Sequence, residues 1–237
     1  MTAELSLLTA TAATIAFVHT LMGPDHYVPF VGMAKANRWT LRRTLLVTLV
    51  CGVGHILGSI ALGFVGVAIQ AQVSTLEIIE GFRGDLAAWA LLSFGIVYAA
   101  WGIRRGWQDR PHTHWHWHGL RPHRHVHQHE ERHEHGDGAG SAGSTVTPWV
   151  IFVIFVFGPC EPLILLLMYP AAKESTAGLV MVTGIFGLVT VLTMLFAVGV
   201  SYLALSRIRI PSFARYGHAI AGIAIALCGG SVLFLGL

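Results

Sequence analysis

The sequence predicts an all-α integral membrane protein, with six transmembrane helices arranged as two three-helix inverted repeats. Hydrophobic residues make up 54% of the chain and charged residues only 11%, whereas a soluble domain carries about 25% charged residues. The mean hydropathy is +0.64. The apolar residues form continuous segments and do not alternate with polar ones, which argues against a β-barrel. Helices then remain as the structure that satisfies its own backbone groups in lipid.

Six segments contain about the 20 mostly apolar residues that a membrane-spanning helix needs. They are residues 5–22, 44–69, 86–103, 149–170, 177–205 and 217–237. The domain prediction follows from them: a first repeat at 1–103, a His-rich linker at 104–148 and a second repeat at 149–237. Only Glu4 is charged before the first apolar stretch, so no cleavable signal peptide is predicted, because such a peptide begins with basic residues.

An offset of 135 residues relates the two halves, and it places "FVHTLMGPDH" (17–26) over "FVIFVFGPCE" (152–161). Two consecutive three-helix units cross a bilayer in opposite senses. Inverted repeats of this kind place a binding site near the midplane, where helices are broken. The matching positions are Phe17, Val18, Gly23, Pro24, Thr48, Gly52 and Gly95 with Phe152, Val153, Gly158, Pro159, Thr183, Gly187 and Gly230.

Lys and Arg residues are concentrated on one predicted side of the membrane. Thirteen of them follow the first, third and fifth spans, and only Arg83 and Lys173 lie on the other side. By the positive-inside rule, the thirteen mark the cytoplasmic side. We therefore predict a multi-pass protein of the cell (inner) membrane, with the His-rich linker in the cytoplasm and both termini outside. The basic residues at span ends explain the net charge of +3 without a nucleic-acid partner.

An acidic residue follows the Gly-Pro pair in each half. Asp25 comes directly after it in "GPDHYVPF", and Glu161 comes one residue later in "FGPCEP". Pro breaks a helix, and broken helices persist in membranes where the freed backbone lines a cavity or is buried in protein. A charge within a span costs about 2.5–3.5 kcal/mol on insertion scales, so we expect both acids to be functional. The alternatives are a helix-terminal turn at Asp25 and a structural pair at Glu161.

Two histidines, His19 and His55, also lie within apolar segments. A single buried His is more often a satisfied structural group than a ligand. Together with Asp25, His26 and Glu161, however, they form a set of imidazoles and carboxylates that suits Ni, Co, Zn or Mn rather than Cu(I). The sequence therefore predicts that these five residues form or flank a site for a divalent transition metal.

The predicted linker contains ten of the fourteen histidines within "HTHWHWHGLRPHRHVHQHEERHEH". Alternating histidines with acidic neighbours form many weak sites for first-row metals. Its tail, "GDGAGSAGSTVTP", is small and polar, which is typical of a flexible segment, so the linker is predicted to be disordered without a ligand. The alternative is a solvated tail without a role. The candidate ligands are His112, His114, His116, His118, His123, His125, His127, His129, His133 and His135.

At "HTLMGPDH" (19–26) and "GHILGS" (54–59) the sequence resembles the nickel/cobalt permease superfamily, and most closely its short, six-span urease-accessory-type proteins. The family's mark is a His, four residues, then Asp-His; His19, Asp25 and His26 match it with five intervening residues. The resemblance implies transport of Ni²⁺ or Co²⁺ as substrate; Zn²⁺ is a further candidate because the ligand types also suit it. It implies no permanently bound cofactor and no enzymatic activity. A His-rich cytoplasmic loop is familiar among the family's efflux members.

Two functions of different class fit this pattern. The first is a secondary metal transporter that alternates access between its two halves, with protons as the candidate coupling ion and export favoured over uptake. The second is a non-transporting accessory protein that binds metal and passes it to a partner, such as a metallochaperone, in metalloenzyme maturation. Small residues in "GFVGVA" (63–68) permit close helix packing, within the chain or in a homo-oligomer.

Two further alternatives rank lower. "FGPCEP" resembles the Pro-Cys motif of membrane thiol-disulfide carriers of the cytochrome c biogenesis type, which need a cysteine in each half; the repeat partner of Cys160 is Asp25. An anion exporter of the sulfite type would need a cationic site, and no Lys or Arg lies inside a predicted span. Cys51 and Cys160 are candidate supporting residues of the metal site, with packing as the alternative for Cys51.

Overall fold

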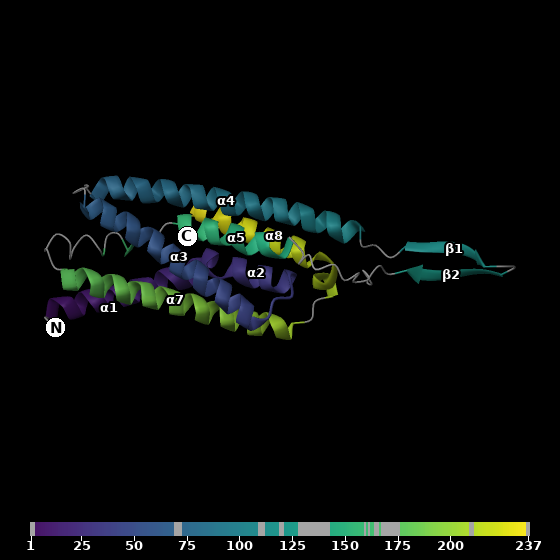
Figure 1. Cartoon of the computed structure of the whole chain (residues 1–237), viewed down its shortest axis with the longest axis horizontal. Helices are drawn as coiled ribbons and strands as arrows, with labels where there is room; N and C mark the ends of the chain where they lie inside the picture. The colour runs from purple at the N-terminus through teal and green to yellow at the C-terminus, as the bar shows by residue number, and fades with distance from the viewer. Residues whose placement is uncertain are drawn as a thin grey trace.

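The computed structural model describes residues 3–68, 73–108, 112–118, 121–127, 143–158, 160, 162–163, 166, 176–208 and 211–235. Long helices form a bundle, and a two-stranded hairpin projects from one end of it (Figure 1). The elements in chain order are α1 (Ala3–Met22), η1 (Pro24–His26), α2 (Val28–Ala36), α3 (Leu41–Ala68), α4 (Val73–Gln108), β1 (His112–His118), β2 (Arg121–His127), α5 (Gly143–Phe157), α7 (Thr176–Arg207) and α8 (Pro211–Leu235).

Five of these helices, α1, α3, α4, α7 and α8, are long and apolar enough to cross a membrane. Large apolar side chains such as Leu46, Val97, Phe196 and Leu227 are exposed on the bundle, where lipid accommodates them and water does not. The helical class and five of the six predicted spans are thus confirmed by length and composition, and they indicate a multi-pass membrane protein. The fourth predicted span, 149–170, corresponds to a shorter apolar helix, and most of its second half lies outside the described residues.

The third span differs from its predicted bounds. α4 begins at Val73 and contains 36 residues, which corresponds to a length of about 54 Å at 1.5 Å per residue. The prediction started this span at residue 86 and placed Arg83 in a loop. Arg83 lies instead within α4, paired with Glu80 one turn earlier. A hydropathy average counts Glu80 and Arg83 as two separate charges and so starts the span too late. In the structure the two side chains form a pair and neutralise each other.

The linker also differs from its prediction where the structure describes it. β1 and β2 pair as antiparallel strands, with His112 opposite His127 and His118 opposite Arg121, whereas the sequence predicts no fixed structure. In β1, Thr and Trp residues alternate with His, and both residue types favour strands. α4 continues to Gln108 and α5 begins at Gly143, so both helices extend into the predicted 104–148 segment. The side chains of the linker histidines lie outside the described part of the chain.

α4 and α8 form a very close helix pair. A Cβ atom added at Gly95 would lie 2.3 Å from the amide nitrogen of Ala226, and one at Gly102 would lie 2.3 Å from that of Ala219. As residue numbers rise along α4 they fall along α8, so the helices are antiparallel. Small residues let the two backbones touch, as in other membrane helix pairs.

The short helix α2 is buried inside the bundle. Its Phe30, Met33 and Ala34 are almost fully buried, and the helix packs against α3, α7 and α8. Around it, α1 packs on α7, α5 packs on α3, and α3 packs on α7. This packing holds the chain break between α1 and α2 within the protein, where its polar groups need partners.

Candidate metal-binding site

The chain breaks after α1 at Gly23 and Pro24. The Gly23 amide donates to the His19 carbonyl at 3.0 Å, and Pro24 has no amide hydrogen to continue the helix. A Cβ atom added at Gly23 would lie 2.6 Å from Nδ1 of His26 and 2.7 Å from Oδ1 of Asp25. The side chains of Asp25 and His26 therefore fold back over Gly23, and glycine is the residue that leaves them room.

Three histidines from three elements meet at this break. The ring centroids of His19 in α1 and His26 in η1 are 5.1 Å apart, and those of His26 and His55 in α3 are 5.5 Å apart. His26 and His55 are each 3% exposed, and Asp25 is partly buried beside them. We call these three histidines and Asp25 the histidine cluster; it brings together four of the five metal-site residues that the sequence predicts.

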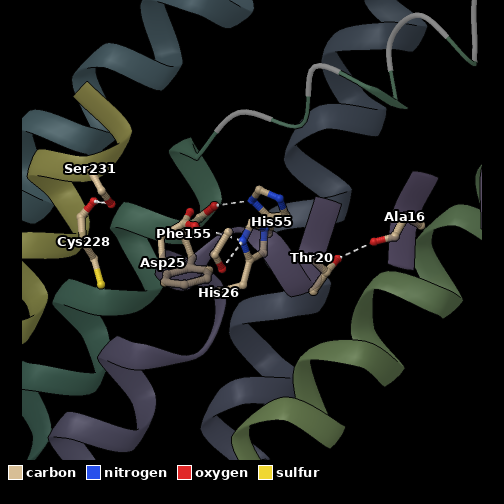
Figure 2. A network of polar contacts seen from close by, with 9 residues as sticks. Ala16, Thr20, Asp25, His26, His55, Phe155, Cys228 and Ser231 are labelled. Carbon is tan, nitrogen blue, oxygen red and sulfur yellow. Dashed lines mark hydrogen bonds and ion pairs between the residues drawn. The ribbon is translucent and has the colours of Figure 1, made fainter. Parts of the chain in front are cut away.

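Hydrogen bonds fix two of the three rings (Figure 2). Nδ1 of His26 lies 3.1 Å from Oδ1 of Asp25 and 3.3 Å from the Gly23 carbonyl oxygen. Nδ1 of His55 lies 3.1 Å from the Phe155 carbonyl oxygen. A carboxylate or carbonyl oxygen only accepts, so Nδ1 carries the proton in both rings, and Nε2 of the neutral ring is left with a lone pair.

The Nε2 atoms of the histidine cluster have no partner. Those of His19, His26 and His55 are all buried and none makes a hydrogen bond within the described structure. Buried polar atoms in native proteins are nearly always satisfied, and leaving one unpaired costs about 1–3 kcal/mol. Three such atoms on neighbouring rings could bind a ligand that accepts electron pairs.

A cavity of about 290 Å³ adjoins the histidine cluster. The cluster supplies its polar wall, and mostly apolar residues of α1, α4, α5 and α8 supply the rest. Its lining includes His19, Asp25, His26, His55, Gly84, Ala87, Ala88, Phe155, Gly158 and Val232. The space is therefore large enough for an ion that keeps some of its water.

The cluster is not arranged around a single point. Within the described ranges, no three His, Cys, Asp or Glu side chains stand in a geometry that already holds a metal ion. The rings meet edge to face, with interplanar angles of 79° for His19 and His26 and 89° for His26 and His55. A metal ion held by several of these residues at once would therefore require a change in their relative positions.

Comparison of the chain with protein-family models, with curated proteins and with solved structures gave no match. The resemblance to the nickel/cobalt permeases therefore rests on the motifs at residues 19–26 and 54–59 alone.

The remaining predicted residues divide into two groups. Glu161 lies outside the described residues, as do the side chains of the linker histidines. Cys51 and Cys160 are buried and free, and neither is among the residues that line the cavity. Cys51 packs in the apolar core around α2, and Cys160 packs in a second core with residues of α1 and α7. For both cysteines the structure supports packing over a place in the cavity wall.

The structure also shows a buried polar group that the sequence analysis did not select. Glu80 and Arg83 form an ion pair on α4, and Glu80 is fully buried. Arg83 donates to the Val156 carbonyl oxygen at 3.1 Å, and Glu80 accepts from the Cys160 amide at 3.2 Å. The spacing of the two residues, three positions apart in "IIEGFRGDLAAW", was the available signal, because such pairs face the same side of a helix.

α2 separates the histidine cluster from the basic turn that follows it. Nζ of Lys35 donates to the Leu205 carbonyl oxygen at 3.0 Å, and the Tyr202 hydroxyl donates to the Trp39 carbonyl oxygen at 2.8 Å. Both bonds join the end of α2 and its turn to the last turns of α7. None of these four residues lines the cavity, whose lining includes Val232 near the end of α8.

Proposed function

We propose that this protein is a secondary transporter for divalent transition-metal ions, with Ni²⁺ and Co²⁺ as its main cargo and Zn²⁺ as a further candidate. The observation that carries the proposal is the set of three buried, unpaired Nε2 atoms on His19, His26 and His55. Hydrogen bonds hold two of these rings with the Nε2 lone pair free, an arrangement that metal-binding histidines share. Imidazole with carboxylate suits borderline divalent metals.

The place of the cluster favours transport over storage. The break at Gly23 and Pro24 lies inside a bundle of long apolar helices, and transporters with broken helices bind their cargo at such breaks. Asp25 supplies negative charge for a cation in this apolar setting. The cavity adjoins the cluster, as access of an ion to the proposed site requires.

The proposed architecture has six spans in two inverted three-helix repeats, the fourth span being 149–170. The helix contacts support it, because they come in related pairs. Under the 135-residue offset, α1 corresponds to α5, α3 to α7 and α4 to α8. Exchanging the two repeats then turns the packing of α1 on α7 into that of α5 on α3. The same exchange leaves the α3–α7 and α4–α8 pairs unchanged.

We favour export over uptake, with protons as the coupling ion. An inside-negative potential favours entry of a dication by about 4.6 kcal/mol per 100 mV, twice the single-charge value, so export needs an opposing ion flow. The His-rich linker would collect cytosolic metal. Removal of residues 112–135 is then expected to lower the export rate at low metal concentration, and an unchanged rate would count against this direction.

The test is the metal content of cells with and without the protein, measured by elemental analysis after separate loading with Ni²⁺, Co²⁺, Zn²⁺ and Mn²⁺. Less Ni or Co in the expressing cells means export, and more means uptake. The double variant Asp25→Ala/His26→Ala, at equal membrane abundance, should abolish the difference. His218→Gln, a histidine of α8 outside the cavity that pairs with Tyr98, is the control and should keep it.

The second candidate is the non-transporting accessory protein, favoured by the ten histidines outside the bundle helices. A metal platform needs this linker and not the histidine cluster. If linker removal abolishes every metal-dependent effect while the Asp25→Ala/His26→Ala variant behaves as wild type, the accessory function replaces the transporter. Arg83 does not provide the free cation of an anion exporter, because Glu80 and backbone carbonyls occupy it.

A further inference from the structure

The end of α5 faces an ion pair on α4. Glu80 is fully buried and the side chain of Arg83 is 15% exposed. Burying two charges costs several kcal/mol per ion in proteins unless hydrogen bonds use their remaining donors and acceptors. The partners of this pair are therefore informative about why the chain retains it.

Those partners are backbone groups at or just beyond the end of α5 that have no hydrogen-bond partner within the helix. Nη2 of Arg83 donates to the carbonyl oxygens of Val156 and Gly158, at 3.1 and 3.5 Å. Oε2 of Glu80 accepts from the Cys160 amide at 3.2 Å. A helix end leaves its last carbonyls unpaired and carries partial negative charge, so a cation belongs there. The acid binds an amide where the chain continues beyond the break.

The same break presents the carbonyl that orients His55. The Phe155 carbonyl oxygen accepts from the Gly158 amide at 3.0 Å and from Nδ1 of His55 at 3.1 Å. A Cβ atom added at Gly58, one turn after His55, would lie 2.6 Å from the Val156 carbonyl oxygen. α3 therefore lies directly against the last turn of α5, and a shift of that turn would move the acceptor of His55.

We propose that Glu80 and Arg83 are positioning residues for His55. By binding both sides of the α5 break, the pair fixes the Phe155 carbonyl, which in turn accepts from Nδ1 of His55 and leaves Nε2 of that ring unpaired. Neither residue is among those that line the cavity, so they act through the backbone of α5 and not on the ion. The inference rests on the proposed function, since it assigns the pair's effect to a metal ligand.

The first readout is Co²⁺ binding to the purified full-length protein, followed by its ligand-field absorption. Subtracting the same titration of His55→Ala removes the signal of the linker histidines. Partners that orient a metal-binding histidine typically contribute 10- to 100-fold in metal affinity. The Co²⁺ affinity obtained from the difference titration should therefore fall by about 10-fold or more in Glu80→Gln and in Arg83→Gln. Arg83→Lys keeps the charge but not the guanidinium, and it should fall between Arg83→Gln and wild type.

Matched controls lie on the same helix. Glu77 and Arg104 are exposed residues of α4, so Glu77→Gln and Arg104→Gln repeat the chemical changes away from the break. Both should bind Co²⁺ as wild type does. Should Glu80→Gln or Arg83→Gln not purify as a monodisperse protein, the milder Arg83→Lys decides, and wild-type affinity and absorption in that variant would overturn the proposal.

The second readout needs no metal. In ¹⁵N-histidine-labelled protein, the His55 signals, assigned by their loss in His55→Ala, report which ring nitrogen carries the proton. Wild type should show a protonated Nδ1, and Glu80→Gln and Arg83→Gln should shift these signals toward a mixture. Unchanged signals overturn the positioning role. If wild type and His55→Ala bind Co²⁺ equally, the proposed function fails at this site, while the metal-free spectra still decide the role of the pair.

Discussion

Nδ1 of His55 lies 3.1 Å from the carbonyl oxygen of Phe155, one hundred positions later in the chain. This contact joins α3 of the first half to α5 of the second half. It fixes the proton on Nδ1 and leaves Nε2, which is buried and unpaired, as an acceptor. A polar link of this kind between the halves would couple the shape of the proposed metal site to their relative position, as the proposed alternating access requires.

Replacement of His19 by Leu should not destabilise the metal-free protein. The change removes a buried, unpaired Nε2, whose burial costs about 1–3 kcal/mol, so the melting temperature in chelator should stay equal or rise. Added Ni²⁺ should raise the melting temperature of wild type, because a ligand that binds the folded state stabilises it. It should raise that of the variant much less. A metal-free variant that melts well below wild type would show that His19 is a structural residue.

Asp25→Asn tests charge separately from shape. The Asn side-chain oxygen still accepts from His26, so the ring stays oriented, but the negative charge beside the cavity is lost. We expect Ni²⁺ affinity to fall by about 10-fold or more, which equals 1.4 kcal/mol, in titrations of purified protein. Asp25→Glu should keep most of the affinity. Equal binding by wild type and Asp25→Asn would remove Asp25 from the site.

Gly95→Ala should destabilise the bundle through the α4–α8 contact. The added methyl group would lie 2.3 Å from a backbone nitrogen of α8, and overpacking of this kind costs about 1–3 kcal/mol. Gly81→Ala on the same helix is the control. Its methyl group would meet nothing within 4 Å among the described residues. Ala also stabilises a helix by about 1 kcal/mol relative to Gly, because its helix propensity is higher. Thermal melts should therefore move in opposite directions, and parallel shifts would contradict the close contact.

The number of spans can be read from the positions of the termini. With 149–170 as a complete span there are six, and both termini lie outside; with five spans they lie on opposite sides. A protein that fluoresces only in the cytoplasm should be dark when fused after Leu237. It should fluoresce when inserted after Gly138 in the linker. Fluorescence from the C-terminal fusion would contradict the inverted-repeat architecture.

Much of the fold follows from local sequence, and so does part of the site. Continuous apolar segments predict α1, α3, α4, α7 and α8, since length and hydropathy alone decide a span. His19 and His26 flank the same Gly-Pro break, so their proximity follows from the chain itself. His55 joins them only through the packing of α3. The motif at residues 54–59 suggested His55 as a site residue, but the sequence could not show where α3 packs.

The groups that contact the histidine cluster or its supporting backbone were missed for physical reasons. The Phe155 carbonyl is a backbone acceptor, and any residue type presents one, so no pattern marks it. Arg83 was assigned to a segment outside the spans and Glu80 was not selected, because hydropathy sums residues singly and cannot register that a pair neutralises itself. The burial of α2 likewise depends on helices contributed by both halves of the chain.

The central claim is that the histidine cluster carries a metal ion across the membrane. Its most direct test is Co²⁺ and Ni²⁺ flux into proteoliposomes that contain a metal-sensitive dye, with wild type beside the double variant His26→Ala/His55→Ala at equal protein content. The account predicts flux well above protein-free liposomes for wild type and none above that background for the variant. Equal flux through wild type and the double variant would contradict this claim. So would the absence of wild-type flux for both metals, tested with proton gradients imposed in each direction.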